Sequence, residues 1–180
     1  EFAHKYKIIK IITNNKNKGQ SYSIYRGISN AKYENIITID GDGQNDPNDI
    51  NGLISIFKES KYSLVGGIRT VRKDNYIKIF SSKIANYVRK KILNDDCDDT
   101  GCSLKIFKKN IFLQLVYFDG MHRFLPALFK SQGCNVNYIS VNHRKRNLGE
   151  SKYGTFDRLF KGTKDLFKVY RIIKNSKTND

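Results

Sequence analysis

The stretch Ile36-Ile-Thr-Ile-Asp40-Gly-Asp42-Gly-Gln44-Asn-Asp-Pro47 decides the fold of this chain. Its opening apolar run predicts a buried strand, and that strand ends abruptly in two carboxylates separated by one residue. In extended backbone, residues two apart point the same way, so Asp40 and Asp42 can converge on one cation. The carboxyl end of a strand in an open α/β sheet is also where ligand crevices form.

The chemistry of this stretch has three interpretations. Carboxylates separated by glycines, which remove side-chain bulk, suit a Mg²⁺ or Mn²⁺ ion that neutralises a bound diphosphate. An EF-hand loop also begins with Asp-x-Asp, but it needs glycine and glutamate where this chain has Asn45 and Asn51, so calcium is disfavoured. The third interpretation is an acidic turn that only caps the helix beginning at Pro47.

Apolar periodicity on both sides of the stretch predicts alternating strands and helices. Strands are expected at residues 6–13, 35–39, 62–68, 103–107 and 136–141, and helices at residues 20–32, from residue 47 onward, and at 76–93 and 124–131. Asp46 is expected to cap the helix at Pro47. The alternation predicts an α/β fold with a mixed, mainly parallel sheet flanked by helices.

The end of the chain carries an amphipathic helix. Between residues 155 and 174, apolar side chains recur at three- and four-residue steps. A second stripe is basic and consists of Arg158, Lys161, Lys164, Lys168 and Arg171. The pattern fits an ordinary surface helix packed on the core, and it equally fits a helix lying at an anionic membrane surface.

Composition limits the classes of protein that this chain can represent. The 180 residues include 33 Lys+Arg and 17 Asp+Glu, a net charge of +16, so anionic partners are expected. A hydrophobic content of 39% predicts one folded domain. The three cysteines form no disulfide or zinc pattern and fit a reducing compartment. Since the chain opens at Glu1 in what resembles the middle of a fold, we expect an N-terminal truncation.

A second group of candidate ligands follows the last expected strand. The loop His143-Arg-Lys-Arg146-Asn-Leu-Gly149-Glu-Ser151-Lys152 combines guanidinium, hydroxyl and ammonium donors with glycine. Such donors suit an oxyanion such as phosphate. In so Lys-rich a chain, a merely solvated basic loop is the alternative interpretation.

Four motifs in this order resemble the family-2 glycosyltransferases of the dolichyl-phosphate mannose synthase and polyprenyl-phosphate glycosyltransferase type, which have a GT-A fold. The motifs are Asp40-x-Asp42-x-Gln44, Val65-Gly-Gly-Ile-Arg69, Asp99-Thr-Gly-Cys-Ser103 and Arg146-x-x-Gly-x-Ser-Lys152. The resemblance implies an inverting enzyme that moves a hexose of mannose or glucose type from a nucleotide-diphosphate sugar to polyprenyl or dolichyl phosphate or a related cell-envelope acceptor. It also implies a Mg²⁺ or Mn²⁺ cofactor.

The resemblance assigns donor and metal roles residue by residue. Asp40, Asp42 and Gln44 match the family's metal and donor-diphosphate positions. Arg69 matches a position that faces the donor phosphates, and Asp99 a position near the transferred sugar.

The acceptor side is implied in the same way. Arg146, Ser151 and Lys152 match positions that hold the acceptor phosphate, and Arg123 is expected near them. Asp42, Asp99, Arg146 and Lys152 are therefore the expected catalytic residues. A phosphate with a second pKa near 6 is largely ionised at neutral pH, so a protein base is not required.

Residues 1–154 are expected to form the catalytic domain, and residues 155–180 a basic amphipathic helix and tail. The expected location is cytoplasmic and peripheral, with the helix on an anionic membrane surface and with no nucleic-acid partner. Three alternatives remain open: a nucleic-acid-binding basic domain, a Mg²⁺-dependent nucleotidyltransferase, and an inactive glycosyltransferase fragment.

Overall fold

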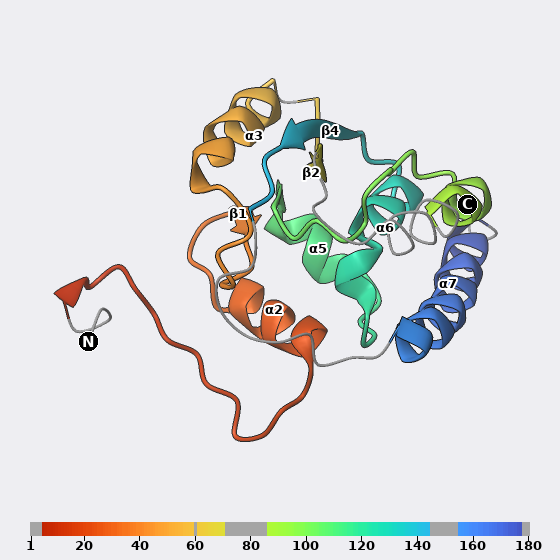
Figure 1. Cartoon of the computed structure of the whole chain (residues 1–180), viewed down its shortest axis with the longest axis horizontal. Helices are drawn as coiled ribbons and strands as arrows, with labels where there is room; N and C mark the ends of the chain where they lie inside the picture. The colour runs from red at the N-terminus through yellow and green to blue at the C-terminus, as the bar shows by residue number, and fades with distance from the viewer. Residues whose placement is uncertain (1–4, 60, 71–85, 145–154, 178–180) are drawn as a thin grey trace.

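Figure 1 shows the chain in a computed structural model, which describes residues 5–59, 61–70, 86–144 and 155–177. The strands are β1 (Asn35–Thr38), β2 (Leu64–Arg69), β3 (Lys105–Lys108) and β4 (Val136–Val141). The helices are α2 (Gln20–Ser29), α3 (Ile50–Phe57), α5 (Lys109–Gln114), α6 (Leu125–Ser131) and α7 (Thr155–Lys177), with 3-10 turns η1 (Pro47–Asp49) and η2 (Met121–Arg123). Residues 86–93 are also helical.

The described strands form one mixed sheet in the order β1-β3-β2-β4. Strand β3 is antiparallel to both β1 and β2, and β2 is parallel to β4. It follows that β1, β2 and β4 run in one direction and β3 in the other, which confirms the mixed sheet. Two of the three described pairings are antiparallel, so parallel pairing does not predominate among the described strands as expected. The carboxyl ends of β1, β2 and β4 and the start of β3 share one edge.

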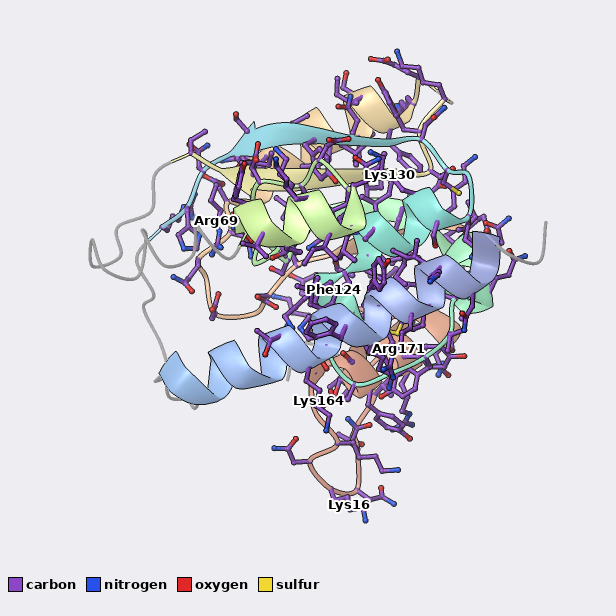
Figure 2. The ribbon with its side chains drawn as sticks, turned by 90° about the vertical axis from the view of Figure 1, so that its right-hand side faces the viewer. Lys16, Arg69, Phe124, Lys130, Lys164 and Arg171 are labelled. Carbon is purple, nitrogen blue, oxygen red and sulfur yellow. The ribbon has the colours of Figure 1, made fainter. Side chains whose placement is uncertain are left out.

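Alternation along the strands separates two apolar cores on the two faces of the sheet. Ile36, Leu64 and Phe107 pack in one core with residues of α2, α5, α6 and α7. Their neighbours Ile37, Val65 and Ile106 point to the other face, where α3 contributes side chains. Figure 2 shows this layering, with the sheet between α3 and the remaining helices.

Most of the expected elements are confirmed within a few residues. The Asp46 cap is also confirmed, because its Oδ1 accepts a hydrogen bond of 3.0 Å from the Asn48 backbone N–H. Of the helix expected at residues 76–93, the part at 86–93 is helical and the rest lies outside the described residues. The short helix α5 was not expected from the sequence.

The strand expected at residues 6–13 is wrong. No strand pairing involves these residues in the described part of the chain, and the segment extends away from the body of the molecule in Figure 1. Ile8 and Ile11 are 93% and 68% exposed. An apolar run forms a stable strand only when a ladder partner and a packing face are available, and this segment has neither among the described residues.

Helix α7 packs on the core and confirms the expected C-terminal amphipathic helix. Val169 is fully buried, with Leu166 and Ile173 partly buried in the same cluster. Asp165 on this helix accepts a hydrogen bond of 2.5 Å from Arg123. No helix in the described part of the chain combines the length and apolar content needed to cross a membrane.

Phe107 offers a test of the larger core. Its ring lies 5.5 Å from that of Phe112 and 5.8 Å from that of Phe129 between ring centroids, and the side chain is fully buried. We expect Phe107→Ala to lower the free energy of unfolding by about 3–5 kcal/mol in urea titrations. The control Tyr33→Ala, at a side chain 71% exposed, should change it by less than about 0.5 kcal/mol. Equal losses in the two variants would contradict the described packing.

Candidate functional site

Chemistry-bearing side chains gather where the strand ends meet. We call Asp40, Asp42, Gln44, Arg69 and Asp99 the carboxyl-edge site. The first three follow β1, Arg69 ends β2, and Asp99 lies on the segment that leads into β3. The strand directions bring these segments, far apart in the sequence, to the same edge of the sheet.

Ser103 joins the loop after β1 to the segment before β3. Its hydroxyl oxygen accepts hydrogen bonds from the Asp40 backbone N–H at 3.1 Å and from the Asn45 side-chain amide at 2.9 Å. The Asp40 carboxylate itself accepts a hydrogen bond of 3.0 Å from Gln20 Nε2 at the start of α2. The loop is therefore anchored at both ends.

We call residues 40–44, which follow β1, the carboxylate loop. Asp42 Oδ1 accepts from the Gln44 backbone N–H at 3.1 Å, which closes a tight turn. Side chains added at Gly41 or Gly43 would meet no described atom within 4 Å, so the loop is open above its backbone. The described residues hold no group of three or more His, Cys, Asp or Glu side chains that could bind a metal alone. Mg²⁺ commonly needs only one or two carboxylates, because water and substrate phosphates complete its shell.

A buried ion pair lies at the end of β2. Arg69 Nε and Nη2 donate to the two oxygens of Asp99 at 2.6 and 2.7 Å, a bidentate geometry that fixes both side chains. The Asp99 side chain is 3% exposed and that of Arg69 is 16% exposed. A Cβ atom at Gly101 would lie 2.7 Å from Arg69 Nη2, so a side chain there would displace the guanidinium from its present position.

Lys105 places a buried amine beneath this edge. It is buried on β3, opposite Thr38 and Gly66, and its ammonium group donates to the Cys102 carbonyl. Burial lowers the pKa of Lys105, and the charges of Asp99 and Asp40 offset part of that effect.

The exit of β4 is attached to the carboxylate loop. Gln44 Nε2 lies 3.2 Å from His143 Nε2, and Arg144 forms an ion pair of 2.5 Å with Asp46. The Asn48 backbone amide, followed by the Arg144 guanidinium, lowers the pKa of Asp46. We call residues 143–152, the predicted phosphate-binding loop, the basic loop. Its first two residues, His143 and Arg144, therefore contact Gln44 and Asp46.

Arg123 lies in a separate cluster, next to the start of α2. Its guanidinium pairs with Asp165, and Gly120 at φ +99° allows the approach because a Cβ there would lie 2.6 Å from the Asp165 carboxylate. Ser21 accepts from the Gly120 backbone N–H at 2.8 Å and lies 2.6 Å from His122 Nδ1. The neighbouring Gln20 contacts Asp40, so α2 links this cluster to the carboxyl-edge site.

The other predicted acceptor residues, Arg146, Ser151 and Lys152, lie outside the described residues. Among the described residues, sequence reasoning missed Gln20 and Lys105 as members of this region, and it quoted Ser103 in a motif without giving it a role. A lysine between Leu104 and Ile106 in a short apolar strand was an available signal for Lys105. Gln20 had no such signal, because its contact depends on how α2 packs.

Comparison with known proteins defines the class. The model of glycosyl transferase family 2 matches residues 1–116, so the chain belongs to this family, and the family resemblance is confirmed. The chain is 35% identical over 164 residues to dodecaprenyl-phosphate galacturonate synthase of Rhizobium johnstonii, covering 89% of this chain and 48% of that protein. It is 31% identical over 140 residues to undecaprenyl-phosphate 4-deoxy-4-formamido-L-arabinose transferase of Shewanella sediminis, covering 78% and 42%. The chain thus spans less than half the length of these curated relatives.

A solved structure has a fold similar to the α/β fold described above. Glucosyl-3-phosphoglycerate synthase from Mycobacterium tuberculosis, in complex with Mn²⁺, uridine-diphosphate-glucose and phosphoglyceric acid, superposes with a TM-score of 0.61. The sequences are 10% identical, and the superposition covers 88% of this chain and 56% of the synthase.

The buried pair gives a stability prediction at two adjacent aspartates. Asp99→Asn removes the charge that compensates Arg69, so we expect the free energy of unfolding to fall by about 3 kcal/mol. Asp98→Asn is the matched control, because Asp98 is 63% exposed and pairs with Lys90 at the surface. It should cost less than about 1 kcal/mol. Urea titrations at neutral pH compare the two, and equal costs would contradict the buried ion pair.

Proposed function

We propose that the carboxyl-edge site transfers a sugar from a nucleotide-diphosphate donor to the phosphate of a polyprenyl lipid, with inversion at the anomeric carbon. The observation that carries this proposal is the meeting of the carboxylate loop, the Arg69–Asp99 pair and the base of the basic loop at one sheet edge. The names of the relatives, which contain dodecaprenyl phosphate and undecaprenyl phosphate, support this acceptor class.

Donor binding is assigned to the carboxylate loop. Asp40 and Asp42, with the Gln44 amide, form an oxygen-rich set that suits Mg²⁺ or Mn²⁺. The cation, when bound, neutralises charge on the departing diphosphate. We assign Arg69 to the donor phosphates, with Asp99 orienting its guanidinium and lying near the sugar.

Transfer needs alignment more than proton removal. An oxygen of the acceptor phosphate forms the new bond to the anomeric carbon, while the bond to the nucleoside diphosphate breaks and that group leaves with the electron pair. The phosphate is already ionised at neutral pH. We assign Arg146, Ser151 and Lys152, with Arg123 nearby, to hold it in line, and the gain is proximity and electrostatic alignment.

Calorimetry with a panel of nucleoside diphosphates and Mn²⁺ tests the donor side. We expect one nucleotide to bind only in the presence of the metal, and Asp42→Ala to weaken that binding by at least about 100-fold, since even loss of outer-shell partners costs 10–100-fold. Asp98→Asn should bind like the wild type.

Two results would contradict the donor assignment. Metal-independent binding that survives in Asp42→Ala would move the donor site away from the carboxylate loop. A folded protein that binds none of the nucleotides would favour the inactive fragment. The names of the relatives carry galacturonate and 4-deoxy-4-formamido-L-arabinose, so subsequent donor panels extend beyond mannose and glucose.

The exposed face of α7 supports peripheral attachment to an anionic membrane. Phe167 and Tyr170 are 65% and 44% exposed, and Lys164, Lys168 and Arg171 are exposed beside them. Lys164 and Arg171 lie along this outer helix in Figure 2. Aromatic side chains and cations on the outer face of a helix suit the headgroup region of a bilayer.

Vesicle binding tests this face. Each basic residue near an anionic surface contributes about 1 kcal/mol, so Lys164→Gln with Arg171→Gln should weaken binding to phosphatidylserine vesicles by about 30-fold. The control Lys16→Gln with Lys32→Gln removes the same charge outside α7 and should have a much smaller effect. Equal losses in sedimentation assays would indicate attraction by net charge and would contradict a binding face on α7.

A further inference from the structure

A second set of contacts lies beside the carboxyl-edge site, and the function proposed above assigns no role to its individual residues. Residues 44–49, which continue the carboxylate loop, lie against residues 142–144 at the exit of β4. We call this contact the loop clamp. Asn45 and His143 form an isolated antiparallel bridge, and the Arg144 backbone N–H donates to the Gln44 carbonyl at 2.8 Å.

Side chains reinforce the loop clamp at both ends. The Asp49 carboxylate accepts from the Asn142 backbone N–H at 2.7 Å and from its side-chain amide at 3.0 Å. The Arg144 guanidinium donates to Asp46 Oδ2 at 2.5 Å. The two segments are therefore connected by backbone and side-chain contacts over the whole length of the clamp.

Asp46 performs two tasks through different oxygens. Oδ1 caps η1 by accepting from the Asn48 backbone N–H, and Oδ2 receives Arg144. The Asp46 side chain is 14% exposed, whereas that of Arg144 is 53% exposed. Because Asp46 is held by the cap, it gives Arg144 a fixed partner.

We propose that Asp46 and Arg144 are positioning residues that fix the start of the basic loop relative to the carboxylate loop. The inference rests on the proposed function, in which the carboxylate loop binds the donor and the basic loop binds the acceptor phosphate. It assigns the pair a role in acceptor alignment and none in contact with either substrate.

Chain geometry explains why this anchor matters. Arg146, the first proposed acceptor ligand, follows Arg144 by two residues, and two residues of extended chain span at most about 7 Å. The position of Arg144 therefore sets an upper limit on the distance between the carboxylate loop and the Cα atom of this ligand. A misplacement of about 1 Å can cost on the order of 100-fold in rate, so the anchor has a direct consequence for transfer.

The test distinguishes the effect of losing the Asp46–Arg144 ion pair from the effect of losing the helix cap and from a general loss of stability. Asp46→Asn keeps an oxygen for the Asn48 amide and removes the charge, and Arg144→Gln removes the opposite charge. The double variant completes a mutant cycle. Asp96→Asn is the matched control, because Asp96 forms a surface ion pair of 2.5 Å with Lys130 and lies outside the clamp. Its φ of 53° is one that asparagine tolerates.

The readouts are calorimetric binding of a short-chain polyprenyl phosphate, binding of the nucleotide with Mn²⁺, and amide hydrogen exchange at Asn142 and Arg144. We expect each single variant to weaken polyprenyl-phosphate binding by about 10-fold while nucleotide binding changes less than 2-fold. The double variant should be no worse than either single variant. Exchange of the two amides should accelerate in all three, and Asp96→Asn should match the wild type in every readout.

The positioning role would be overturned by additive losses in the double variant, by equal losses of nucleotide and polyprenyl-phosphate binding, or by unchanged exchange at Asn142 and Arg144. A wild-type protein that binds neither ligand would instead refute the proposed function and remove the basis of the inference with it. Wild-type binding of both ligands, with Asp46→Asn binding the acceptor normally, would refute the positioning role alone.

Discussion

The reversed direction of β3 is the constraint on which the site depends. Because β3 lies antiparallel between β1 and β2, the segment that enters it begins at the edge where β1 and β2 end. Asp99 can therefore reach Arg69, and Ser103 can bind the backbone of Asp40. A parallel β3 would place its entry, and the buried carboxylate of Asp99, at the opposite edge.

The sheet also explains how a strongly basic chain can hold carboxylates at its ligand edge. Asp99 is compensated by Arg69, and the buried amine of Lys105 lies below. Asp40 and Asp42 remain on a loop held by Gln20, Ser103 and a tight turn. Asp40 and Asp42 on the loop therefore suit a divalent cation, whereas the buried carboxylate of Asp99 orients Arg69.

Local sequence patterns were sufficient to predict those elements whose formation depends mainly on neighbouring residues. The apolar run at Ile36, the cap at Asp46 and the helix expected between residues 155 and 174 each reflect local chemistry, and the structure contains all three. The expected apolar stripe of that helix is only partly right, because Leu166 and Ile173 pack on the core whereas Phe167 and Tyr170 are exposed. The Ile-rich run at residues 6–13 failed because a strand also needs a partner, which periodicity does not report. The contacts of Gln20 and the pairing of Asp46 with Arg144 depend on tertiary packing and were likewise beyond local patterns.

The central claim is that the carboxylate loop binds a metal together with a nucleoside diphosphate, and paramagnetic broadening measures it most directly. Mn²⁺ added to the labelled protein with a bound nucleoside diphosphate should broaden the amide signals of Gly41, Gly43 and Gly101 before all others. Broadening centred on the exposed carboxylates of Asp96 and Asp98, with the glycine signals unchanged, would contradict the account.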